Sequence, residues 1–140
     1  MAGEFIEEGL RSMFLADGYL ASQISTRFYD AELPLGYRIE SGPAVTLQRV
    51  SGVPEYVHSG QVGQENARFQ VTVHADCHLA CMRVAASVKR VIREHPRGQL
   101  PGGFRFGLLQ QVNEVVMGRE TGRDLFAIAI DFRMTYQVDF

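Results

Sequence analysis

The stretch "ARFQVTVHADCHLACMRVAASVKRVI" (residues 67–92) changes its hydrophobic period from two residues to about 3.6 residues near its middle. Phe69, Val71 and Val73 alternate with polar residues, and this alternation predicts a strand with one buried face. Asp76 is the expected N-cap of a helix whose apolar residues fall on one side, at positions 77, 80, 81, 84, 88, 91 and 92. A strand that leads directly into an amphipathic helix is therefore expected at the centre of the fold.

Further strands are predicted on both sides of this unit. The segment "LFAIAIDFRMTYQVDF" (residues 125–140) alternates apolar and polar residues throughout and is the clearest strand signal in the chain. The segment "AVTLQRVS" (residues 44–51) alternates in the same way. The segment "FRFGLLQQVNEVVM" (residues 104–117) is expected to form a hairpin with the last strand, because "GRETGRD" between them supplies turn glycines.

The N-terminal residues 5–14 carry apolar side chains at helical spacing, and Asp17 and Gly18 interrupt the run. The expected order of elements is therefore α, β, β, α, β, β. This order predicts an α+β fold with an antiparallel β-sheet and two helices packed on one face, in a single domain over residues 1–140.

The composition is that of a soluble globular protein. The chain has 140 residues, of which 46% are hydrophobic and 21% charged, and its formal net charge is −2. No apolar run approaches the roughly 20 residues that cross a bilayer, and the N-terminus is acidic where a signal peptide would be basic. We therefore expect no membrane contact, synthesis in the cytoplasm, and no general attraction to nucleic acid.

Two histidines and both cysteines lie within eight residues, at His74, Cys77, His78 and Cys81. One hypothesis is a small metal- or thiol-dependent enzyme or sensor built on these four side chains. The alternative is that both cysteines are small core residues of the helix and that His74 lies on the polar face of the strand. We favour the alternative, because zinc motifs usually add a second ligand pair at a distance and the chain has none.

Other catalytic motifs are missing from the sequence. No G-x-S-x-G nucleophile motif occurs, and "GQVGQEN" (residues 60–66) has neither the lysine nor the following helix of a phosphate-binding loop. We therefore expect no catalytic residues, no cofactor, no bound metal and no enzyme activity.

The segment "GVPEYVHSGQVGQEN" (residues 52–66) contains three glycines and a proline and has no sustained period, so we expect a long hairpin loop. Loops longer than about 12 residues in compact domains are usually functional or disordered. Pro54, Tyr56 and Val57 are apolar groups that a fully solvated loop does not need. The sequence thus marks this loop as a candidate contact surface.

Residues 45–92 resemble the central signature of the tail-terminator, or tail-completion, proteins of long-tailed bacteriophages, prophages and gene transfer agents. The matching features are a strand that ends in "QRVSG", a loop, a strand of the "RFQVTVHA" kind and an amphipathic helix. The resemblance extends upstream to "ISTRFYDAELP", similar to the family's short strand and proline-bearing loop, and downstream to "AIAIDFRMTY", similar to its closing strand. The junction "HADCH" departs from the family pattern.

This resemblance implies a structural protein of the virion tail and neck. Such proteins form a ring, commonly a hexamer, on the last ring of the tail tube, where they stop its polymerisation and offer a surface to the neck. The implied partners are other copies of the chain, the tail tube protein, and the neck and head-closure proteins, with DNA only as passing cargo. A neck or head-completion connector protein is the nearest alternative.

Two surfaces follow from this expected role. We expect the loop to contact the tail tube through Pro54, Glu55, Tyr56, Val57, His58, Gln61, Gln64 and Glu65. We expect the polar strand face to line the lumen through Thr46, Gln48, Arg68, Gln70, Thr72, His74, Asp131, Arg133, Thr135 and Gln137. Edge strands at "FRFGLLQQV" (residues 104–112) and "AIAIDFRM" (residues 127–134) are expected to abut neighbouring subunits around the ring.

Overall fold

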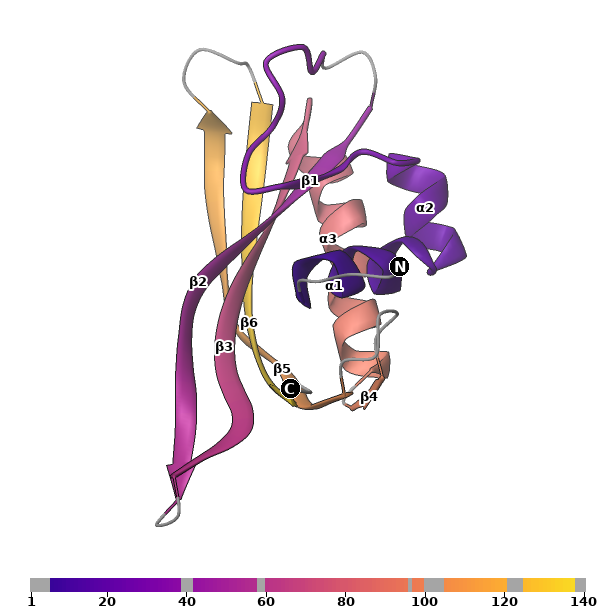
Figure 1. Ribbon diagram of the computed structural model, residues 1–140. Helices are drawn as coiled ribbons and strands as arrows, with labels where there is room; N and C mark the ends of the chain where they lie inside the picture. Colours follow the sequence, from indigo (N-terminus) through magenta and orange to yellow (C-terminus); the bar gives the residue numbers. More distant parts are fainter. Residues whose placement is uncertain are drawn as a thin grey trace.

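The computed structural model describes residues 6–38, 42–57, 60–95, 97–99, 105–120 and 125–137. Three helices and a six-stranded sheet make up this part of the chain, and their arrangement is drawn in Figure 1. In chain order the elements are α1 (Ile6–Leu15), α2 (Gly18–Ile24), β1 (Phe28–Asp30), β2 (Ala44–Val57), β3 (Gly60–Ala75), α3 (His78–Glu94), β4 (Gly98–Gln99), β5 (Arg105–Glu120) and β6 (Leu125–Gln137).

The strands lie in the order β1-β2-β3-β6-β5-β4. Every neighbouring pair is antiparallel except β1 and β2, which are parallel. The α+β class predicted from the sequence is therefore confirmed, whereas the predicted order α, β, β, α, β, β and the fully antiparallel sheet were wrong. The order lacked α2, β1 and β4, because the last two are only two or three residues long and too short to show a period.

The helices lie together on one side of the sheet in Figure 1. The core lies between the two layers, and alternate residues of the central strands point into it. Phe69 stacks on Phe132 of the neighbouring strand at 5.6 Å between ring centroids, and Phe14 of α1 lies 6.2 Å from the Phe132 ring. Phe14 also stacks on Phe28 of β1 at 5.7 Å, so this aromatic cluster joins α1, β1, β3 and β6.

Helix α3 begins one residue later than the sequence predicted. Asp76 was the expected N-cap, but Cys77 holds that position and makes no side-chain capping bond. Cys77 is consequently exposed, and the prediction that it lies in the core was wrong. Cys81, one turn further along the helix, is buried as predicted, together with Val84, Val88, Val91 and Ile92 of the apolar stripe.

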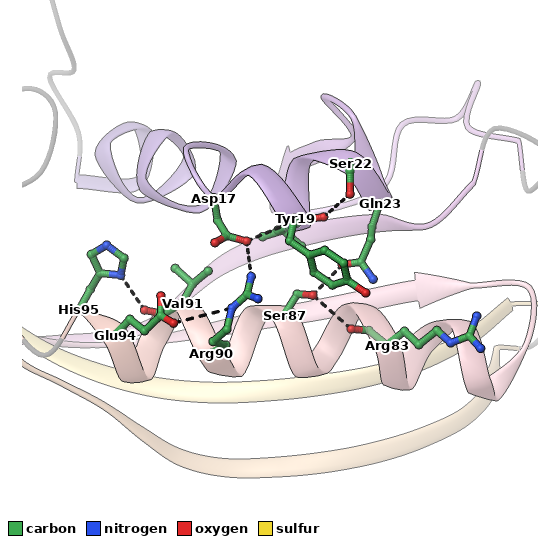
Figure 2. Close-up of polar contacts among 11 residues, drawn as sticks. Asp17, Tyr19, Ser22, Gln23, Arg83, Ser87, Arg90, Val91, Glu94 and His95 are labelled. Atoms are coloured by element: carbon green, nitrogen blue, oxygen red, sulfur yellow. Dashed lines mark hydrogen bonds and ion pairs between the residues drawn. The ribbon is translucent and has the colours of Figure 1, made fainter.

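A polar contact holds α2 against α3, as Figure 2 shows. The carboxylate of Asp17 accepts a hydrogen bond from the backbone amide of Leu20 at 2.9 Å, which caps α2, and also pairs with the guanidinium of Arg90. That guanidinium lies over the Tyr19 ring at 5.3 Å from its centroid. Asp17 thus both starts the second helix and ties it to the third, so Asp17–Gly18 is a corner between two helices.

The segment predicted as a long loop over residues 52–66 is instead part of a β-hairpin. Strand β2 continues to Val57 and β3 begins at Gly60, with Val53 paired to Asn66 and Tyr56 paired to Gln61. Register shifts between Arg49 and Ser51 and between Pro54 and Tyr56 interrupt the alternation of strand β2. The glycines and the proline make the strand still harder to recognise in the sequence. The prediction of a long loop over these residues was therefore wrong, because the two strands continue to the tip of the hairpin.

Substitution of Asp17 tests how much this corner contributes to stability. We expect Asp17→Ala to lower the free energy of unfolding by about 1–2 kcal/mol, because it removes both the cap of α2 and the ion pair with Arg90. Asp17→Asn is the matched control, because asparagine caps a helix as well as aspartate does. It should cost at most about 1 kcal/mol, since Arg90 is partly exposed. Urea unfolding measures both, and equal losses would contradict the importance of the cap.

Candidate interaction surfaces

The end of the β2–β3 hairpin extends beyond the rest of the sheet. Within the part of the chain that the structure describes, β3 is paired with β6 as far as Gln64 and Gln137, whereas β2 and β3 remain paired as far as Val57 and Gly60. Figure 1 shows this two-stranded segment projecting past the helices and past the neighbouring strands. We refer to residues 54–57 and 60–64 as the arm. A two-stranded ribbon has little stability of its own, so a projecting arm favours contact with another surface.

The arm and the residue next to it carry nearly all of the tube-contact residues expected from the sequence. Pro54, Glu55, Tyr56 and Val57 lie on β2, Gln61, Gln64 and Glu65 lie on β3, and His58 lies outside the described residues. The structure thus gathers these positions on one projecting hairpin rather than on a loop.

The sheet face opposite the helices carries most of the polar residues expected to line a lumen. Arg68 and Asp131 form an ion pair there at 2.8 Å. Arg133 donates a hydrogen bond to the side-chain oxygen of Gln110 at 3.1 Å. Arg68 and Arg133 are register partners, so their two positive charges lie side by side. The negative charge of Asp131 offsets one of them.

Two residues assigned to this polar face are buried instead. Thr46 and His74 are 5% and 8% exposed, and the threonine hydroxyl lies 3.2 Å from Nε2 of the histidine. Their neighbour Ala44 forms a small apolar cluster with Leu33, against which aromatic rings of the segment after α2 pack. The alternating pattern correctly separated Thr46 and His74 from the main core, but it could not show that this end of the opposite face is also covered.

The proposed metal or thiol cluster does not assemble. The Sγ of Cys81 lies 3.1 Å from the carbonyl oxygen of Phe126, and burial raises the pKa of its thiol to about 11. Cys77 and His78 are exposed, and His74 is engaged with Thr46. Within the described ranges no three histidine, cysteine or acidic side chains are placed to share a metal ion.

The two flanks of the sheet expose strand edges. In the described ranges, β1 covers β2 only from Val45 to Leu47 on one flank, and β4 covers β5 only at Arg105 and Phe106 on the other. Among the described residues the remaining outer edges of β2 and β5 have no strand partner. The expected edge at residues 104–112 therefore falls on an edge strand, whereas the one at residues 127–134 was wrong, because β6 is paired on both sides.

Exposed apolar side chains on β5 were missed by the sequence analysis. Val112, Val115, Val116 and Met117 are each between 46% and 60% exposed. The signal was present as "EVVM", a run of adjacent apolar residues in a strand that otherwise alternates. Such a run puts apolar groups on both faces of an edge strand, which is typical of a contact surface.

The chain matches the family of tail completion protein gp17 over residues 8–137. It belongs to this family. The tail completion fold is also found in a chain of the structure described as "Virion of native gene transfer agent (GTA) particle". The two chains are 21% identical, the match covers 97% of this chain and 100% of the other, and the TM-score is 0.68. No curated protein sequence matches the chain.

Family membership identifies the chain as a structural protein of phage-type tails. The resemblance noted in the sequence is thereby confirmed at the level of the family. Across the described residues of this tail completion protein, no helix is both long enough and apolar enough to cross a membrane.

The two thiols of the tail completion protein should react differently. At pH 8 we expect a maleimide to modify the exposed Cys77 rapidly and to leave Cys81 unmodified, because burial both shields that thiol and raises its pKa. Denaturation should expose the second site. Mass spectrometry of native and denatured samples counts the modified thiols per chain.

The same difference should appear in stability. Cys81→Ala should lower the free energy of unfolding by about 1–2 kcal/mol, whereas Cys77→Ala should change it by less than about 0.5 kcal/mol. Binding of one zinc ion per chain, lost in either variant, would contradict this assignment of the cysteines.

Proposed function

We propose that the protein closes the growing end of a phage-type tail tube. Copies of the chain form a ring, expected to be a hexamer, that sits on the last ring of the tube and stops its polymerisation. The opposite side of the ring presents a surface to the neck and head-closure proteins, and DNA passes through the lumen. The role needs surfaces and no catalytic group, and residues 1–140 act in it as one domain.

The arm is the observation that carries this proposal. It projects from the sheet as two strands, and of its described residues only Gln64 is still paired with β6. Among the described residues, neither the outer edge of β2 in the arm nor that of β3 from Gly60 to Gly63 has a strand partner. Pairing of these edges with another chain would stabilise a ribbon that is weak alone. A terminal ring of tube protein offers a repeated surface on which six such arms could lie.

The polar sheet face supports the passage of DNA. A conduit should bind its cargo weakly, because each phosphate that a protein neutralises adds affinity. The Arg68–Asp131 ion pair and the Arg133–Gln110 hydrogen bond engage the two arginines of this face within the subunit. We place the face toward the lumen, with Gln48, Gln70 and Thr72 among its other polar groups.

Removal of the arm tests the proposal. Val53 and Asn66 are register partners, so an Asn-Gly turn in place of residues 54–65 should close a shorter hairpin. Of the described β3–β6 ladder, the sheet then loses only the last two pairs, those of Gln64 and Glu65. We expect this variant to keep its fold, measured by circular dichroism and thermal unfolding. Tails assembled with it should be longer than normal and of variable length, because nothing stops the tube at its proper end; electron microscopy measures the lengths.

Leu35→Ser is the matched control, because Leu35 is 98% exposed and belongs to the segment between β1 and β2 rather than to the arm. It should give tails of normal length. Uniform tails from the armless variant would exclude the arm as the capping surface. Binding of the wild-type protein to portal or adaptor but not to tail tubes would instead show a head-completion connector.

A further inference from the structure

The two flanks of the subunit carry hollows of opposite charge. Between α1 and the β1–β2 edge lies a hollow of about 310 Å³, lined by Glu7, Glu8, Arg11, Phe28, Asp30 and Leu47. Three of its side chains are carboxylates. Its guanidinium, from Arg11, donates to the carbonyl oxygen of Phe28, and Arg49 lies 3.9 Å from Glu7 beside it. We call this side the α1–β2 flank, and its lining is acidic overall.

The opposite side has a groove of about 650 Å³ between α3 and β5, lined by Ala86, Lys89, Ile92, Arg93, Leu109, Gln110 and Gln111. Both of its charged lining groups are cations. Lys89 pairs with Glu114 at 2.9 Å, whereas Arg93 is exposed. We call this side the α3–β5 flank, and its lining is basic overall.

The hollow and the groove lie within about two residues of each other in level along the strands, because Gln111 of the groove belongs to the row of Phe132 and Phe69. One row of register partners crosses all the long strands, from Asp30 through Leu47, Val71 and Ile130 to Glu114. Asp30 and Leu47 line the acidic hollow, and Glu114 binds the lysine of the basic groove. Two copies placed side by side with an offset of about two residues or less along the strands would therefore bring the hollow of one against the groove of the other.

The direction of the strands suits the same arrangement. Strands β2 and β6 run in one direction and β3 and β5 in the other, so β5 of one copy would be antiparallel to β2 of the next. The helices of each copy lie on a single side of its sheet, so α1 of one copy would stand beside α3 of its neighbour. A contact between two different flanks is heterologous, and such contacts close into rings.

Apolar groups on the two edges match in level as well. Val50 on β2 is 53% exposed and falls beside the register shift at Arg49, whose partner is Phe69. Val112 on β5 is 47% exposed and follows Gln111, the partner of Phe132. Phe132 in turn pairs with Phe69, so the two valines lie at the same level. Both valines sit at bulges in the pairing of their strands with β3 and β6, and a bulge twists an edge so that a regular ladder with another strand is disfavoured. Side chains should therefore supply most of the contact.

From these matches we propose that the α1–β2 flank of one copy docks against the α3–β5 flank of the next. Glu7 and Glu8 then face Lys89 and Arg93, and Val50 packs against Val112. The occupant of both surfaces is a second copy of this chain. The inference deepens the proposed function and rests on it, because it names the contact that holds the ring together.

A charge-exchange experiment tests this contact. In one variant the acidic flank becomes basic through Glu7→Gln and Glu8→Arg. In the other the basic flank becomes acidic through Lys89→Gln and Arg93→Glu. Glu7 pairs with Arg49 and Lys89 pairs with Glu114 within the subunit. These two residues are replaced by neutral glutamine, so that no like charge is placed beside Arg49 or Glu114. Thermal unfolding of each variant verifies the fold.

Each variant alone should need at least about tenfold more protein than wild type to form a ring, because two flanks of the same sign would meet. An equimolar mixture should recover ring formation to within about twofold of wild type, because unlike flanks then alternate. Native mass spectrometry measures the protein concentration at which rings form, for each variant and for the mixture, with and without tail tubes. Arg83→Glu, an exposed charge reversal on α3 outside the groove, is the control and should assemble normally.

The failures can be distinguished. If wild type forms rings and both variants form them equally well, with no gain on mixing, the flanks are not the ring contact, although the proposed function stands. If wild type neither forms a ring nor binds tail tubes, the proposed function itself is wrong.

Discussion

The pairing of β3 with β6 is the contact on which the other elements depend. It extends from Gln64 and Gln137 to Ala75 and Phe126, and it joins residues that are far apart in the sequence. The β2–β3 and β5–β6 hairpins are local, but only this ladder brings them into one sheet. It also decides which residues face the helices, since a slip of one residue would exchange the two faces of the strand.

That constraint explains which parts of the fold could be predicted. Phe69, Val71 and Val73 alternate with polar residues because helices cover only one face of their strand, so the sequence alone predicted the strand. The apolar stripe of α3 predicted a helix for the same reason, because only one side of the helix is buried. In contrast, β1 pairs through only three residues, and its parallel direction depends on a crossover that no local pattern encodes.

The candidate surfaces were less predictable, because they depend on how elements are placed together. The sequence singled out Pro54, Tyr56 and Val57 as candidate tube contacts, and their contact with a tube is a proposal. Their predicted secondary structure was wrong, since a bulged hairpin and a loop share glycine and proline. The burial of Thr46 and His74 depends on a distant segment near Leu33, which period-two alternation cannot reveal. The opposite charges of the two flanks are also invisible in a net charge of −2, because they cancel in the sum.

Lys89 is the only lysine in the sequence, and it lies on α3 beside β5, where it pairs with Glu114. The subunit therefore carries its sole side-chain amine on one flank. Any amine-directed dye, cross-linker or solid support that reacts with a side chain must attach there, which gives a labelled subunit a defined orientation. Because the other 13 of the 14 lysine and arginine residues are arginines, acylation of side-chain amines is confined to this one position.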